Sequence, residues 1–377
     1  MGGLCCAEGF SQLFADLEKH WQEPTLQEGR AHGLEAVHEC FGCASKLSEA
    51  FDVSSEVLGV GSFGAIRRAA CRRTAAACAV KTLELRRLPE RSAAELSEEL
   101  RIHRSCKHPN IVHIFECFQG QGEFHIAMEA CDGGDFRDFM RQEGKLCEWT
   151  AGLALLQVLE AVMYLHEVHF VAHRDLKMEN LLLKFMRVPL EENVVKITDF
   201  GLASRFAPGE SSLSALCGTP EYLAPEVVLA KYDEKCDTWS CGIILYELLI
   251  GALPWDAETP GETMWMARMR PLRLDGLPLS EDVKALLRSL CRKDPRFRAS
   301  AREALESAWL GQISARASAL PARAGGAPLE AEREAVGKPL GGDVSSAETM
   351  PEPACWEEGG CCDRSSSSST EAVNDLD

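Results

Sequence analysis

The spacing of apolar residues changes several times along this chain, and the changes predict its elements. Short apolar runs are typical of strands, whereas recurrence every three or four residues is typical of helices. Strands are predicted in this way at 77–80 and 124–130, single helices at 91–107 and 149–167, and a pair of helices at 277–310. The mixed pattern covers 51–310, so we expect one large folded unit with flanking segments on both sides.

The most apolar run lies between Ile243 and Ala252 and contains Glu247. It is too short and too interrupted to cross a bilayer. We therefore expect a buried helix at this point of the chain.

An amphipathic helix is predicted near the start of the chain, where apolar residues recur at helical spacing from Phe10 to Trp21 and the pattern stops at Pro24. Its polar face is not basic. We therefore expect its apolar stripe to dock on the folded unit or on a partner rather than on lipid.

The first residues read MGGLCC, which is similar to an acylation signal. A single acyl chain on Gly2 would hold a membrane weakly, so Cys5 or Cys6 would have to carry a second one. A plain disordered start is the open alternative.

The formal net charge of −18 argues against nucleic acid and against electrostatic attachment to anionic membranes. The 17 cysteines are scattered through predicted helices and strands, without a signal peptide at Met1. We expect a reduced, cytoplasmic protein, which acylation would hold at the cytoplasmic face of a membrane. Nothing in the pattern indicates oligomerisation, and a monomer is expected. Residues 311–377 are rich in Ala, Gly, Pro, Glu and Ser and are expected to be a disordered tail.

Polar residues with phosphoryl-transfer chemistry flank two short apolar runs, 181–183 and 194–197. Transfer of a γ-phosphoryl group needs a carboxylate for the attacking hydroxyl, a cation against the developing charge and oxygen ligands for Mg²⁺. The residues that supply this set are Asp175, Lys177, Asn180 and Asp199. We expect them to share one cleft.

A glycine-rich turn runs from Leu58 to Ile66 with the pattern GxGxxG. Glycines let backbone amides approach phosphates, but the same pattern also opens dinucleotide-binding helices. The next apolar segment ends in Lys81 and lacks the acidic residue of a dinucleotide site, which disfavours a dinucleotide-binding helix.

Together, HRDLKMEN at 173–180, DFG at 199–201 and this turn resemble eukaryotic protein kinases of the Ser/Thr type over 51–310. Within the family, the sequence of these motifs most resembles calcium/calmodulin-dependent and calcium-dependent kinases, but no EF-hand loop is present. The resemblance implies an α+β bilobal fold. Its parts would be a small, mainly β N-lobe at 51–128, a hinge at 129–132 and a larger, mainly α C-lobe at 133–310.

The resemblance also implies ATP as co-substrate, Mg²⁺ held by Asn180 and Asp199, and protein substrates. The residues that it assigns to ATP lie in the glycine-rich turn, the N-lobe strands and helix, the hinge and the facing side of the C-lobe. They are Leu58, Gly59, Gly61, Gly64, Ile66, Ala79, Lys81, Glu99, Met128, Glu129, Cys131, Asp135 and Leu182. Glu99 is expected to pair with Lys81, with Glu95 and Glu98 as alternatives.

Substrate selection is implied by Thr219, which with Lys177 favours serine and threonine over tyrosine. Asp135, Glu179 and Glu247 stand where kinases that prefer a substrate arginine place acidic groups. We therefore expect an arginine three residues before the target.

Several structural roles are also implied. Candidate phosphosites are Ser211, Ser212 and Ser214, whose phosphates could pair with Arg174. Ala215 stands where relatives often carry a phosphorylated threonine, and His103 replaces an apolar residue of the internal stack. Two braces are expected, an ion pair between Glu226 and Arg298 and a contact of Asp237 with the catalytic loop.

Two other functions remain open, a pseudokinase that binds nucleotide without transferring phosphate and a membrane-tethered scaffold. An active kinase is favoured because every chemical role has a candidate residue.

Overall fold

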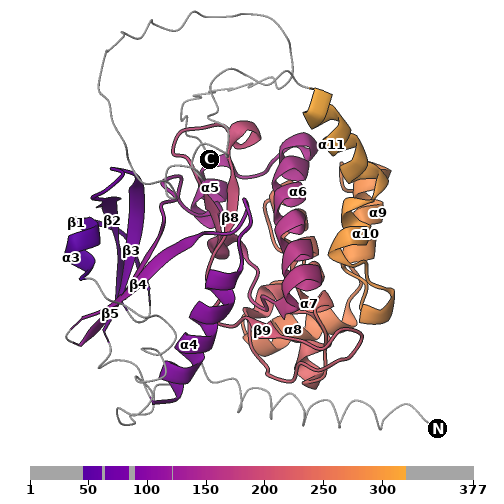
Figure 1. Ribbon diagram of the computed structural model, residues 1–377. Helices are drawn as coiled ribbons and strands as arrows, with labels where there is room; N and C mark the ends of the chain where they lie inside the picture. Colours follow the sequence, from indigo (N-terminus) through magenta and orange to yellow (C-terminus); the bar gives the residue numbers. More distant parts are fainter. Residues whose placement is uncertain (1–45, 62–63, 85–89, 121, 320–377) are drawn as a thin grey trace, which may run out of the picture.

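The computed structural model describes residues 46–61, 64–84, 90–120 and 122–319. Figure 1 shows a small lobe built around a sheet, beside a larger lobe built of helices. This is the expected α+β bilobal fold.

The small lobe holds an antiparallel five-stranded sheet in the order β1-β2-β3-β5-β4. Its strands are β1 (Phe51–Gly61), β2 (Gly64–Cys71), β3 (Ala77–Glu84), β4 (Ile114–Gln119) and β5 (Glu123–Glu129), and its helices are α3 (Leu47–Ala50) and α4 (Glu90–Ser105). In β3 the buried run Cys78, Ala79 and Val80 precedes Lys81, which places the lysine in the middle of the central strand of the sheet.

The large lobe is mainly helical. Its helices are α5 (Phe136–Glu143), α6 (Glu148–Tyr164), α7 (Lys235–Ile250), α8 (Pro260–Met269), α9 (Glu281–Leu290), α10 (Ala301–Leu305) and α11 (Ala308–Ala319). Its short strands are β6 (Val171–Ala172), β7 (Leu181–Leu183), β8 (Val195–Ile197) and β9 (Ser204–Arg205). A π-helical turn, Leu165–His169, continues α6, and single 3-10 turns lie at Met178–Asn180, Leu190–Glu192, Pro220–Tyr222, Val227–Leu229 and Pro295–Phe297.

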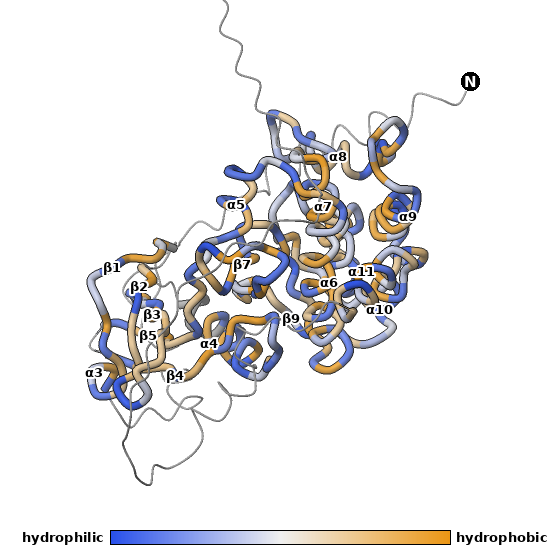
Figure 2. The backbone as a smooth tube through the Cα atoms, turned by 90° about the horizontal axis from the view of Figure 1, so that it is seen from above, coloured by the Kyte–Doolittle hydropathy of each residue, from blue (hydrophilic) through white to orange (hydrophobic). Residues whose placement is uncertain are grey.

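The core of this lobe surrounds α6 and α7, where Figure 2 shows hydrophobic stretches of both helices inside the lobe. By length and composition, Glu148–His169 could cross a membrane. However, the helix is packed inside the lobe, with Leu155, Leu159 and Val162 at 0 % exposure. It is therefore a core helix, as is α7, whose buried residues include Ile243, Leu245 and Leu249 of the apolar run expected at 243–252.

The described structure extends past two expected boundaries, at 51 and at 311. The folded unit does not begin at 51, because Leu47 and Ala50 of α3 pack against the small-lobe cluster around Phe51. The tail does not begin at 311, because α11 continues to Ala319 and its Ile313 is buried against the core. Burial of an apolar side chain such as Ile313 stabilises the ordered helix, although the local Ala and Gly content is typical of a disordered tail.

The last helical region also differs from the expected pair. Three helices, α9, α10 and α11, occupy 277–319. The break before α10 follows from Ser300, whose side chain caps the helix and forms a capping box with Glu303.

Candidate active site

Asp175, Lys177 and Asn180 of the catalytic loop come together where β7 and β8 pair as a two-stranded ribbon. Asp199 follows Thr198, whose backbone N–H donates to the Asn180 carbonyl at 3.0 Å. Asp175 Oδ1 accepts a hydrogen bond of 2.7 Å from the Thr219 hydroxyl, and its Oδ2 lies 2.9 Å from Lys177 Nζ. Lys177 Nζ also donates to Thr219 Oγ1 at 2.8 Å. The carboxylate, the ammonium group and the threonine therefore form one closed cluster, as the resemblance implied.

Asn180 completes this cluster from the other side. Its amide nitrogen donates to the backbone oxygen of Asp175 at 2.8 Å and to Oδ2 at 3.1 Å. The amide is thereby oriented, and its oxygen is the atom that can hold a cation.

Asp199 follows β8 and has a φ of +63°, a rare conformation for a residue with a side chain. A carboxylate and an amide oxygen are ligands that Mg²⁺ accepts when waters and phosphates complete its shell. The donor set of Asn180 and Asp199 thus fits the expected metal. Within the described ranges, no group of three or more His, Cys, Asp and Glu side chains could hold a metal ion.

The catalytic loop is braced by Asp237, which lies in α7 and has 0 % exposure. Its carboxylate accepts the backbone N–H groups of His173 at 2.7 Å and Arg174 at 2.8 Å. It also lies 2.9 Å from His166 Nε2. Burial by itself would raise the pKa of Asp237, but the hydrogen bond and charge of His166 and the contacts of His173 outweigh it, and the pKa is lowered. The carboxylate therefore stays ionised and fixes the loop, which confirms the expected brace.

Glu99 does not form the expected ion pair with Lys81, although each acts on the same region of the cleft. Burial raises the pKa of Glu99, Lys81 lowers it, and Asp199 raises it. The two alternatives are placed elsewhere, because Glu98 pairs with Arg205 at 3.9 Å and Glu95 is exposed. Glu99 remains the glutamate of α4 whose pKa responds to the charge of Lys81.

His103 fills the place of an apolar residue in a stack that links the two lobes. Its ring stacks on Phe200 with 4.3 Å between centroids, and Phe200 meets His173 edge to face at 5.0 Å. His103 Nε2 bonds the Val112 carbonyl at 2.7 Å. Burial lowers the pKa of His103 to about 4, so the ring is neutral near pH 7 and packs as an aromatic side chain.

An apolar wall, made of residues that the resemblance assigns to ATP, joins both lobes. Ala79 and Met128 are buried in one small-lobe cluster, and Ile66, Cys131 and Leu182 pack against it. Leu182 comes from β7 of the large lobe and closes the wall. Residues that lie far apart in sequence therefore meet as the resemblance implied.

The glycines of the turn have different roles. A Cβ at Gly64 would lie 1.7 Å from the Thr82 carbonyl oxygen, whereas one at Gly59 would meet nothing within 4 Å. Gly64 is thus required by the close approach of β2 and β3. Leu58 is half exposed at 37 %. Gly61 ends β1 opposite Gly64, and 62–63 lie outside the described residues.

The hinge is held by two lysines that the sequence reading missed. Glu129 lies 2.7 Å from Lys184 Nζ and 2.7 Å from Lys196 Nζ. Burial would raise the pKa of Glu129, but the two ammonium groups outweigh it and lower the pKa. No local motif marks these lysines, because Lys184 directly follows β7 whereas Lys196 lies within β8.

The three acidic residues expected to bind substrate arginine are not equivalent. Asp135 caps α5 by accepting the backbone N–H of Asp138 at 2.8 Å. Glu179 and Glu247 both contact Arg137, a residue that the sequence reading did not single out.

The segment before Thr219 places Ser211, Ser212 and Ser214 at the surface. Arg174, the expected partner of a phosphate, donates through Nε to the Leu202 carbonyl at 2.6 Å and through NH1 to the Tyr232 hydroxyl at 3.3 Å. The Tyr232 hydroxyl in turn donates to the carbonyl of Ala215 at 2.7 Å. The arginine already has neutral partners, and the phosphosites stay predictions.

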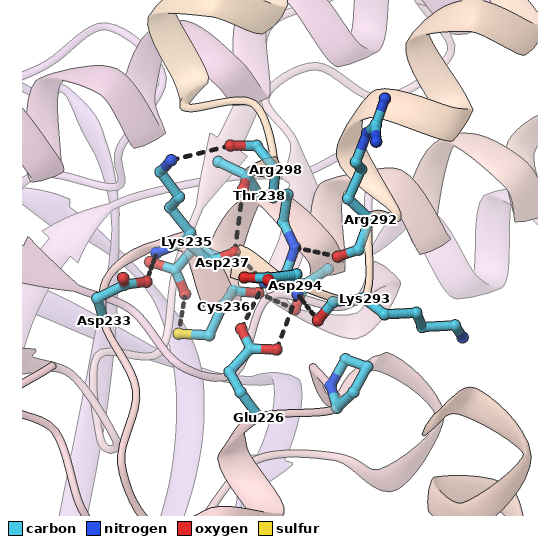
Figure 3. A network of polar contacts seen from close by, with 12 residues as sticks. Glu226, Asp233, Lys235, Cys236, Asp237, Thr238, Arg292, Lys293, Asp294 and Arg298 are labelled. Carbon is cyan, nitrogen blue, oxygen red and sulfur yellow. Dashed lines mark hydrogen bonds and ion pairs between the residues drawn. The ribbon is translucent and has the colours of Figure 1, made fainter. Parts of the chain in front are cut away.

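The expected ion pair between Glu226 and Arg298 is confirmed (Figure 3). The two guanidinium nitrogens meet the two carboxylate oxygens at 2.5 and 2.8 Å. Arg298 also donates to the carbonyls of Lys235 and Arg292, each at 2.9 Å. The pair therefore joins the end of the activation segment to the start of α7 and the loop before α10.

The acylation candidates Gly2, Cys5 and Cys6, and the helix expected at 10–21, lie outside the described residues.

Comparisons with known proteins find similar chains. Residues 53–310 match the protein kinase domain family. The chain is 32% identical to serine/threonine-protein kinase 33 of Bos taurus, over 78% of this chain and 60% of the relative. It is 30% identical to calcium-dependent protein kinase 3 of Plasmodium berghei, over 70% of this chain and 47% of the relative. It is 36% identical to myosin light chain kinase 3 of Rattus norvegicus, over 72% of this chain and 34% of the relative. The chain thus matches between about a third and three fifths of the length of these relatives.

Proposed function

This chain belongs to the protein kinase family, and from that premise we propose that it transfers the γ-phosphoryl group of ATP to serine and threonine hydroxyls of proteins. The observation that carries the proposal is the closed cluster of Asp175, Lys177 and Thr219, with contacts of 2.7 to 2.9 Å. A scaffold that only binds partners has no need of this cluster.

Each residue of the cluster has a defined task. Asp175, held by Thr219 and Asn180, orients the substrate hydroxyl and accepts its proton. Lys177 contacts Asp175 and therefore lies beside the reacting hydroxyl, where its ammonium group offsets the negative charge that develops on the transferred phosphoryl group. Lys81 supplies a second cation for the phosphates. Mg²⁺ bound by Asn180 and Asp199 would offset the remaining phosphate charge.

The alternative is a pseudokinase or membrane-tethered scaffold with the same fold. Its support is limited to the Lys81–Glu99 pair, which is not formed in the described structure, and to His103 in the stack. The neutral His103 ring packs well, and a kinase helix can rotate to close an ion pair. We therefore favour the active enzyme.

The test compares wild type with Asp175→Asn on a panel of Ser/Thr peptides with Mg·ATP, and measures ATP binding separately. Wild type should transfer phosphate and the variant should lose about 100-fold or more in rate while it still binds ATP. Binding of ATP by wild type without any transfer would favour the scaffold.

The finer parts of the proposal rest on the sequence. We propose a preference for arginine three residues before the target, through Asp135, and a monomeric, cytoplasmic enzyme. Acylation of Gly2 with Cys5 or Cys6 would bring it to the cytoplasmic face of a membrane. Membrane fractionation of Gly2→Ala tests this, because loss of membrane association would follow only if Gly2 is acylated.

A further inference from the structure

Arg137 of α5 contacts three groups from three different parts of the large lobe. Its Nε lies 2.9 Å from Glu179 Oε1, its NH2 donates to the Tyr222 hydroxyl at 2.5 Å, and its NH1 forms an ion pair with Glu247. The Tyr222 hydroxyl donates to the other oxygen of Glu247 at 2.5 Å. Every nitrogen of the guanidinium group is therefore engaged.

This cluster lies beside the reacting centre. Glu179 belongs to the same loop as Asp175 and precedes Asn180, which bonds Asp175. Tyr222 follows Thr219 in the 3-10 turn that begins there, and Thr219 also bonds Asp175. A peptide whose hydroxyl reaches Asp175 must place neighbouring residues over this part of the surface.

The cluster has the chemistry of a cation-binding subsite. The Glu247 side chain is only 6% exposed, and a buried carboxylate needs a cation as partner. Glu179 is 43% exposed and adds a second carboxylate from the substrate side. Two carboxylates and a tyrosine hydroxyl suit the planar fork of a guanidinium group.

We propose that Arg137 occupies this subsite as a built-in arginine, so that the subsite is closed to basic residues of the substrate. The three acidic residues expected from the sequence to bind substrate arginine then have different roles. Asp135 stays available to a substrate arginine, whereas Glu179 and Glu247 are neutralised within the chain. This inference rests on the proposed kinase activity and narrows its substrates to those with one basic determinant rather than two.

The test is an arginine scan of a peptide that the wild type phosphorylates, with kcat/KM measured for each position. For wild type, arginine should raise kcat/KM at no more than one position of the peptide. In Arg137→Ala and in the neutral but polar Arg137→Gln, arginine at a second position should raise kcat/KM by about 10- to 100-fold, the range expected when an arginine meets an unpaired carboxylate. Adding Glu179→Gln should remove most of that new gain.

Arg141→Ala is the matched control. Arg141 lies on the same helix, is 70% exposed and pairs only with Asp138 among the contacts described. Its scan should match that of wild type. Thermal unfolding of each variant separates a folding defect from a change in specificity.

Two results would overturn the inference while leaving the kinase activity intact. One is a wild-type enzyme that already gains from arginine at two positions. The other is an unchanged scan in the Arg137 variants. Absence of transfer by wild type to every peptide would instead contradict the proposed function itself.

Discussion

Replacing Arg298 with methionine should be one of the most destabilising single substitutions in the large lobe. Arg298 is 1% exposed and meets both oxygens of Glu226. Its guanidinium group also supplies donors to the carbonyls of Lys235 and Arg292 (Figure 3). Methionine replaces the side chain only as far as Nε, so the substitution removes the rest of the guanidinium group and its charge while it keeps the aliphatic part filled.

The magnitude follows from what the substitution leaves behind. Glu226 is 6% exposed and would keep a buried charge without its cation. Removing one partner of a buried ion pair costs about 3–5 kcal/mol. For a lobe of this size that loss corresponds to a decrease in Tm on the order of 10 °C.

Urea and thermal unfolding of the full chain measure the effect, under reducing conditions because the cysteines in the described part are free. Arg296→Met is the matched control. Arg296 lies in the same turn but is 80% exposed and pairs with Asp294, so the midpoint should hardly change. The double variant Glu226→Met with Arg298→Met should recover most of the stability, because no charge is then left unpaired.

The reasoning would be refuted if Arg298→Met shifted the midpoint no more than Arg296→Met does. The reasoning would also be refuted if the double variant lost more free energy of unfolding than the two single variants lose together. Such a result would mean that the substitutions remove packing rather than charge.

Three further predictions concern the cleft and the sheet. His103→Leu should reduce the loss of stability between pH 7 and pH 5 by about 2 kcal/mol. Burial lowers the pKa of His103 from 6.5 to about 4, so between these pH values the unfolded chain binds a proton that the folded chain does not bind. Equal losses of stability in urea titrations of both proteins would contradict this prediction. Thr219→Val should lower kcat about 100-fold by releasing the catalytic carboxylate, and Thr219→Ser should restore it, in steady-state assays with a saturating peptide. Gly64→Ala should cost about 1–3 kcal/mol because its Cβ would overlap the Thr82 carbonyl, while Gly59→Ala, which meets open space, serves as the control in thermal unfolding.

The catalytic loop could be predicted from the sequence because its chemistry is local. Asp175, Lys177 and Asn180 lie within six residues, and the apolar run that follows them forms β7. The strand carries the loop to the cleft, so spacing alone was enough to place the three side chains together. The same holds for Asp199 after β8.

The chain ends show where local composition failed. Residues 311–319 read as the start of a polar tail, yet they complete α11. Ile313 packs next to Gly152 of α6, and Arg316 lies 4.3 Å from the Trp149 ring centroid. Such contacts depend on a partner helix more than 140 residues away, which no window of neighbouring residues contains.

The sequence by itself determined which chemistry this protein carries, because a phosphoryl-transfer loop needs a few residue types at short, fixed spacing. Only the tertiary structure decided which charges neutralise one another. Arg137 could have been an ordinary surface residue of α5, and Glu247 an ordinary acidic residue of α7; folding buries the second and brings the first to it. A buried carboxylate must find a cation, and which cation it finds depends on how distant helices pack rather than on the order of residues along the chain.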